Sequence, residues 1–131
     1  MFTLARNCFE AMVQDAKARL PNEACGIFSG KETATTFFSM KNTEGSPASY
    51  LMDPTEQFQA MKQIRQKGER MLGIYHSHVK SPAYPSAKDV ALAFYPDVSY
   101  VVVSLSDEAR PVTKAYRIQD GSVQEDALTV V

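Results

Sequence analysis

Both histidines of this chain stand in one short segment, His76-Ser77-His78, with a single residue between them. If the chain is extended there, side chains two residues apart project from the same face of the strand. The two imidazoles are then expected to converge on one point. Because imidazole nitrogens are the commonest metal ligands in proteins, the spacing predicts that His76 and His78 share a metal ion.

A third ligand is expected from Asp89, because Pro82 and Pro85 turn the chain and bring the next helix back to the strand end. Ser86 lies three residues before Asp89, so on a helix the serine hydroxyl and the carboxylate share a face. Two nitrogens and one oxygen suit zinc, and three protein ligands leave the fourth tetrahedral position for water, as in catalytic sites. Water bound in this way reaches a pKa of about 7.

The same residues allow a purely structural interpretation. Ser86 and Asp89 at a helix start resemble a capping box, in which both side chains bind backbone N–H groups and neither does chemistry. An aspartate that caps a helix is not expected to bind a metal as well, so the two interpretations compete. The alternative for the histidines is a pair without metal in a loop or in the core. The spacing from the histidines to Ser86 and Asp89 favours the metal.

The elements that must position these residues follow from the hydrophobic pattern. Apolar residues at helical spacing predict a helix from Ala5 to Leu20. Two runs rich in apolar, β-branched and aromatic residues, 25–30 and 34–40, predict a hairpin. A strand is expected at 50–52. Asp53-Pro54 then provides an N-cap and a proline at the first helical position, and this second helix is expected to run to about Lys67.

The strand that delivers the histidines is expected at 71–75, an apolar run typical of a strand buried on both faces, with His76 at its end. Ser86 is expected to open a short helix that continues to Phe94. Further strands are predicted at 100–104 and 112–118, and Asp120-Gly121 turns into a final strand. Helices interleaved with strands indicate an α/β or α+β class, and residues 1–131 are expected to form one domain.

Composition narrows the function classes. The chain has 131 residues, of which 44% are hydrophobic and 22% charged, so a packed core is expected. A net charge of -1 provides no excess of Lys and Arg for nucleic acid or an anionic membrane. The sequence shows neither a membrane span nor a signal peptide. Cys8 and Cys25 are expected to stay free thiols, both buried, in the cytoplasm.

The chemistry also needs a proton acceptor, and on the residues alone Glu23 is only one carboxylate among several. The complete set, however, resembles the JAMM, or MPN-plus (Mov34/PAD-1-like), zinc metalloprotease family. That family has an upstream glutamate, then His-x-His, seven residues, Ser, two residues and Asp, and the matching residues here are Glu23, His76, His78, Ser86 and Asp89. Residues 21–26, 50–54 and 73–78 are similar to its small stand-alone bacterial branch. Val79 departs from that pattern, since many relatives have proline there.

The resemblance implies a deaminase-like three-layer α/β fold, in which a twisted mixed β-sheet has one long helix on each side. It also implies that His76, His78 and Asp89 bind zinc. Glu23 would take a proton from the zinc-bound water and pass it to the leaving amine, and Ser86 would donate a hydrogen bond to the tetrahedral oxyanion.

The substrate implied by this resemblance is the C-terminal tail of a ubiquitin-like or sulfur-carrier protein that ends in Gly-Gly, with cleavage of an amide or isopeptide bond. The tail is expected to pair with a sheet edge at Ser49–Met52. Three alternatives stay open: a deubiquitinase-like isopeptidase, a non-catalytic MPN scaffold and a hydrolase or deaminase of small molecules. The sequence leaves open a homodimer and a regulatory role for Cys25.

Overall fold

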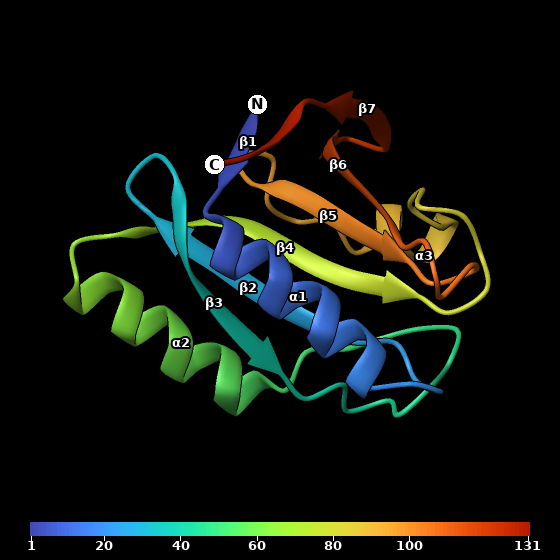
Figure 1. Ribbon diagram of the computed structural model, residues 1–131. Coiled ribbons are helices and arrows are strands. Elements are labelled where there is room, and N and C mark those ends of the chain that lie inside the picture. The colour runs from blue at the N-terminus through green and yellow to red at the C-terminus, as the bar shows by residue number, and fades with distance from the viewer.

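The computed structural model describes all 131 residues, and its centre is one eight-stranded mixed sheet with the strand order β7-β6-β5-β4-β2-β3-β1-β8 (Figure 1). The strands are β1 (Phe2–Leu4), β2 (Cys25–Gly30), β3 (Ala34–Met40), β4 (Arg70–His78), β5 (Ser99–Ser104), β6 (Val112–Gln119), β7 (Ser122–Asp126) and β8 (Leu128–Val130). The helices are α1 (Arg6–Ala18), α2 (Pro54–Gln66) and α3 (Ala87–Ala91).

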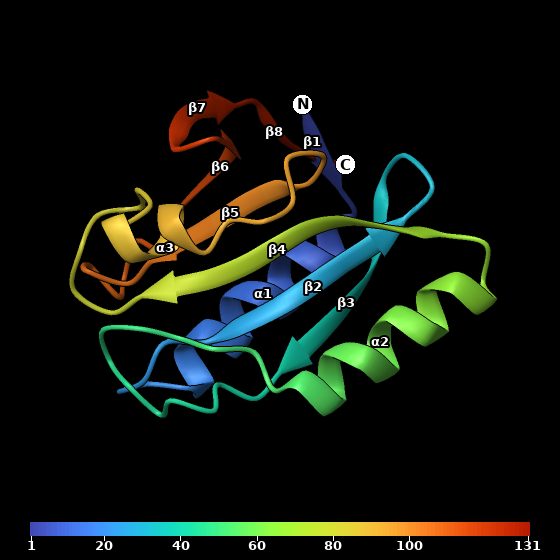
Figure 2. The ribbon, with the colours of Figure 1, turned by 180° about the vertical axis from the view of Figure 1, so that it is seen from behind.

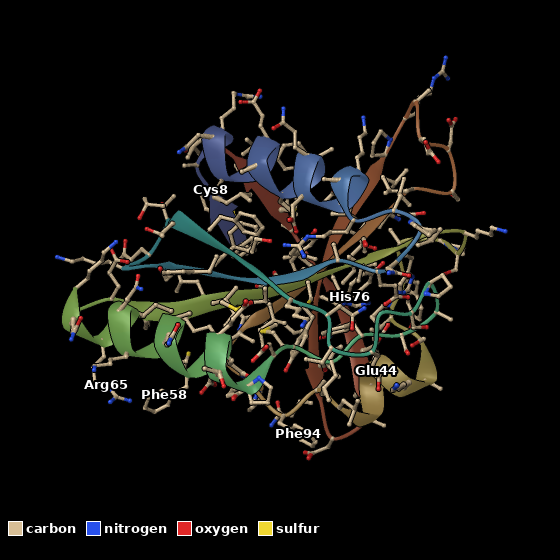
Figure 3. The ribbon with its side chains drawn as sticks, turned by 90° about the horizontal axis from the view of Figure 1, so that it is seen from below. Cys8, Glu44, Phe58, Arg65, His76 and Phe94 are labelled. Carbon is tan, nitrogen blue, oxygen red and sulfur yellow. The ribbon has the colours of Figure 1, made fainter.

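The two long helices cover opposite faces of the sheet, as Figure 3 shows from below. One core joins α1 to the side chains that point to its face, and includes Cys8, Met12, Phe28, Tyr75, Val101 and Val103. The other core joins α2 to the alternate side chains of the same strands, and includes Ile27, Ala60, Ile64, Ile74, Tyr100 and Val102. This alternation is the two-residue period of strands that are buried on both faces. The expected three-layer fold is therefore confirmed.

Strand β4 lies in the middle of the sheet, between antiparallel β2 and parallel β5. Sequence reasoning placed its end at Tyr75, with His76 just beyond. The strand instead continues through His78, because His76, Ser77 and His78 pair with Val102, Val103 and Ser104 of β5. Both histidines are thus held by the sheet itself rather than by a loop.

The hairpin of β2 and β3 and the start of α2 agree with the sequence. The Asp53 carboxylate accepts hydrogen bonds from the backbone N–H groups of Thr55 at 2.8 Å and Glu56 at 3.3 Å, and Pro54 occupies the first turn. Cys8 and Cys25 are buried and free, as predicted. None of the helices is long and apolar enough to cross a membrane.

Two of the expected elements differ in the structure, and two short strands were not expected. Residues 50–52 form no strand: Met52 makes one isolated bridge to Asn42, because the Asn42 side chain closes this segment into a loop. The helix after Ser86 ends at Ala91 rather than at Phe94, whose exposed side chain offers no packing for another turn. Two three-residue strands, β1 and β8, were missed because so short a run carries no readable period.

Gly26 of β2 offers a test of the packing beside the histidine strand. A Cβ at this position would lie 2.5 Å from the Phe38 carbonyl oxygen and 2.9 Å from the Phe37 ring. Because the backbone of β3 must move to make room, we expect Gly26→Ala to lower the free energy of unfolding by about 1–3 kcal/mol in urea denaturation. The exposed Thr35→Ala on β3 is the control, with a change within about 0.5 kcal/mol. Equal stability of the two variants would contradict this packing.

Candidate metal centre

His76 and His78 point to the same side of β4 and are almost completely buried, with exposed fractions of 1% and 3%. Their Nε2 atoms lie 3.0 Å apart. The Asp89 Oδ2 atom lies 2.9 Å from Nε2 of His76 and 3.1 Å from Nε2 of His78. Two imidazoles and one carboxylate from two separate elements therefore meet at one point.

Helix α3 brings Asp89 to this point, and it lies beside the carboxyl end of β4 (Figure 2). Its first turn is closed by a complete capping box. The Ser86 hydroxyl accepts a hydrogen bond from the Asp89 N–H at 3.1 Å, and the Ser86 N–H donates to Asp89 Oδ2 at 2.8 Å. The same Oδ2 atom faces both histidines. The capping box expected from the sequence is therefore present, and it does not turn Asp89 away from the histidines.

The two histidines differ in the contacts that their Nδ1 atoms make. His78 Nδ1 donates to the carbonyl oxygen of Pro82 at 2.8 Å, so in the neutral ring the Nε2 lone pair faces the site. His76 stacks on the ring of Tyr50, with centroids 4.7 Å apart. Its Nδ1 atom is buried and has no hydrogen-bond partner. Two imidazole nitrogens and a carboxylate oxygen thus meet at one point, which is the donor set of a transition-metal site.

The charges of these groups follow from burial and from their mutual contacts. Burial lowers the pKa of His76. Burial alone would raise the pKa of Asp89, but hydrogen bonds with both histidines and with the Ser86 N–H outweigh it and hold that pKa well below its usual range. Asp89 is therefore ionised. Burial also lowers the pKa of His78, but the contacts with Asp89 and the Pro82 carbonyl outweigh it, so the net pKa is raised.

Glu23 lies between α1 and β2 and is only 5% exposed. Its Oε1 atom is buried without a hydrogen-bond partner. Burial raises the pKa of this carboxyl group to about 7, with nearby His78 lowering it and Asp89 raising it. A carboxyl group with a pKa near neutrality and an unused lone pair is suited to accept and return a proton.

An open groove of about 460 Å³ connects Glu23 with the end of β4. Glu23, His78 and Ser86 line it together with Pro47, Ala48 and residues 79–81. The Ser86 hydroxyl accepts from the Asp89 N–H, and its own hydrogen stays free to donate into the groove. The structure thus brings all five residues singled out from the sequence to one place.

Sequence reasoning missed three residues that hold this site. Tyr50 stacks on His76, Asn42 binds the backbone of Glu23, and Ser77 binds the backbone of Ala24. Ser77 could have been recognised, because a polar residue between two buried histidines needs a partner of its own. Nothing in the local sequence points from Asn42 or Tyr50 to residues so distant along the chain.

Comparison with known proteins agrees with the fold and shows the family. Residues 5–119 match the model of a family described as prokaryotic homologs of the JAB domain. A CysO-cysteine peptidase from Mycobacterium tuberculosis is 41% identical over 124 residues, which cover 92% of this chain and 85% of that protein. A probable TtuB-protein conjugate cleaving protease from Thermus thermophilus is 31% identical over 125 residues, which cover 92% and 79%.

A solved structure from Desulfitobacterium hafniense is 38% identical, with a TM-score of 0.89, and the match covers 100% of this chain and 93% of that one. The fold, the site and the peptidase relatives define a hydrolase of the JAMM type. The chain belongs to the family of prokaryotic homologs of the JAB domain. The resemblance seen in the sequence is confirmed.

Ser77 offers a test of how the site is held. Its hydroxyl accepts from the Ala24 N–H at 2.8 Å, and its N–H donates to the Ala24 carbonyl at 3.0 Å. Because Ser77→Ala leaves the buried Ala24 N–H without a partner, we expect the free energy of unfolding to fall by about 1–3 kcal/mol in urea denaturation.

The buried hydroxyl of Thr113 has no hydrogen-bond partner, so Thr113→Val is the matched control and is expected to cost less than about 1 kcal/mol. An equal loss in both variants would show that the Ser77 hydroxyl stabilises no contact between β4 and Ala24.

Proposed function

We propose that this chain is a zinc-dependent peptidase that hydrolyses the amide or isopeptide bond after the C-terminal tail of a ubiquitin-like sulfur-carrier protein. One observation carries the proposal: two imidazole nitrogens and a carboxylate oxygen lie within 3.1 Å of one another, in contact with the groove that Glu23 enters. This arrangement has the ligands, the proton carrier and the access that metal-assisted hydrolysis requires.

His76, His78 and Asp89 would hold the zinc ion. Two nitrogens and one oxygen suit this metal, and three protein ligands keep one position open for chemistry. Bound zinc would polarise the substrate carbonyl and lower the pKa of the attacking water. The Pro82 carbonyl holds the His78 ring in the orientation that binding needs, and Ser86 does the same for Asp89 through its N–H.

Glu23 and Ser86 would carry the remaining steps. With a pKa of about 7, the Glu23 carboxylate accepts a proton from the attacking water and then returns it to the amine that leaves. The Ser86 hydroxyl donates a hydrogen bond to the negative charge that develops on the carbonyl oxygen. Because water attacks directly, no covalent bond between the protein and its substrate is needed.

The substrate class rests on the groove and on the relatives. One relative is named for a CysO-cysteine linkage and another for conjugates between TtuB and proteins, so both names describe the release of something joined to a protein. Pro47, Ala48 and Val79 line the groove, and we propose that the tail lies along it. Pairing of the tail with residues 49–52 is not proposed, because these residues form no sheet edge.

The free thiols of Cys8 and Cys25 suit the cytoplasm, where we propose that the protein acts.

The first test separates metal binding from proton transfer. We expect the purified protein to bind about one zinc per chain, since its three ligands form one open site. Glu23→Gln should keep the zinc and lose about 10²–10⁴-fold in the rate of cleavage, because the amide cannot accept the proton. Metal content is measured by inductively coupled plasma mass spectrometry, and cleavage by single-turnover kinetics. Full activity of Glu23→Gln would refute its role as the base.

His76→Ala is the matched variant, since it removes a ligand and leaves Glu23 in place. We expect it to lose both zinc and activity, with zinc affinity lowered by at least about 100-fold. A variant that kept its zinc would exclude His76 as a ligand.

The second test addresses the substrate. Sulfur-carrier proteins with one extra cysteine, or with several extra residues, after the Gly-Gly end are incubated with the enzyme and analysed by intact mass. We expect trimming that stops at Gly-Gly, because this is the tail that we propose binds in the groove lined by Pro47, Ala48 and Val79. Carriers in which the last glycine is replaced by valine serve as controls. If neither extended form is cleaved, this substrate class is excluded.

A further inference from the structure

Asn42 follows β3 by two residues and uses the full hydrogen-bonding capacity of its side chain. Its Nδ2 group donates to the carbonyl oxygen of Glu23 at 3.0 Å and to that of Ser49 at 3.1 Å. Its Oδ1 atom accepts from the N–H groups of Glu44 and Leu51, both at 3.1 Å. Only an amide side chain offers two donors and two acceptor lone pairs at one point. Asn42 therefore joins the Glu23 backbone to two ends of one loop.

That loop, residues 43–51, forms a wall of the groove and touches the site at several places. Pro47 and Ala48 line the groove, and Tyr50 stacks on His76. Figure 3 shows Glu44 beside α3, where its carboxylate accepts from Lys88 at 2.9 Å. The loop contains no helix or strand, so its shape depends on these bonds and on those of Asn42.

The position of the Glu23 carboxyl group depends on its backbone, because Oε1 has no hydrogen-bond partner to orient it. The backbone is held at three points. Glu23 N–H donates to the Ser46 carbonyl at 2.8 Å, its carbonyl accepts from Asn42, and the next N–H binds Ser77. Two of these three points are Asn42 itself and the loop that Asn42 closes.

We propose that Asn42 is a positioning residue for the hydrolysis: it fixes Glu23 and the loop 43–51 as one unit against the groove. The inference rests on the proposed function, in which Glu23 moves the proton. The Asn42 side chain makes no hydrogen bond to the histidines or to Asp89, and it reaches His76 only through the loop, where Tyr50 stacks on that ring.

Asn42→Asp is the sharpest variant, because it keeps the size of the side chain and its acceptor oxygen. The loop N–H groups of Glu44 and Leu51 keep their partner, whereas the carbonyls of Glu23 and Ser49 now face a carboxylate oxygen in place of a donor. We expect kcat for an extended sulfur-carrier protein to fall roughly 10- to 100-fold, since small displacements of a catalytic group cost this much. Zinc content should stay at the level of the wild-type protein.

Thr43→Val is the matched control on the same loop. It removes the hydrogen bond from the Thr43 hydroxyl to the Leu51 carbonyl, at 3.1 Å, and leaves every bond to Glu23 in place. We expect its kcat to stay within about threefold of the wild type, because one exposed hydrogen bond contributes little free energy to the folded state. If Asn42→Asp does not fold, as judged by circular dichroism, Asn42→Ser takes its place.

A double-mutant cycle shows whether Asn42 acts through Glu23. In the Glu23→Gln background, Asn42→Asp should cause little further loss, because the group that it positions no longer transfers protons. Wild-type kcat in Asn42→Asp, or a loss of the same size in both backgrounds, would overturn the inference.

Amide hydrogen exchange tests the coupling without any substrate. We expect exchange at the Glu23 N–H to quicken in Asn42→Asp and to stay unchanged in Thr43→Val. Unchanged exchange in Asn42→Asp would overturn the inference whatever the substrate is. If the wild-type protein binds zinc but cleaves no carrier, and Asn42→Asp still shows the faster exchange, the proposed substrate alone is overturned.

Discussion

The meeting of two imidazole nitrogens and one carboxylate oxygen within 3.1 Å is the interaction on which the rest of the site depends. Three groups rich in electron pairs lie so close only where something holds them there. Strand β4 holds the two histidines through its pairing with β2 and β5, and α3 holds the carboxylate through its capping box. The sheet and the short helix therefore act together as a rigid frame for these three groups.

Alternation along β4 gives neighbouring residues separate tasks. His76 and His78 face the same side of the sheet as α2, whereas Tyr75 packs in the core under α1. Ser77, between the histidines, reaches across to Ala24 and so binds the segment that carries Glu23. A single strand thus presents both histidines and also anchors the segment of Glu23. The segment that carries Glu23 is thus tied to the histidine strand by a direct hydrogen bond.

Glu23 shows why a buried carboxyl group is useful in such a site. Burial raises its pKa to about 7, which an exposed glutamate does not reach, and it leaves Oε1 free for a proton. The same burial removes the hydrogen bonds that would orient the side chain. Its orientation then falls to the backbone, which Ser46, Asn42 and Ser77 hold from the loop and from β4.

Local sequence determined much of this protein: the helix starting after Asp53, the hairpin at 25–40 and the pairing of His76 with His78 on one strand face, because these depend on period and capping alone. The family pattern added Glu23. Only the tertiary structure decided that Asp89 caps its helix and faces the histidines with the same oxygen, that residues 50–52 lie in a loop rather than a strand, and that Asn42 holds Glu23. These features arise from contacts between residues far apart in the chain, and no local pattern of residue types encodes such contacts.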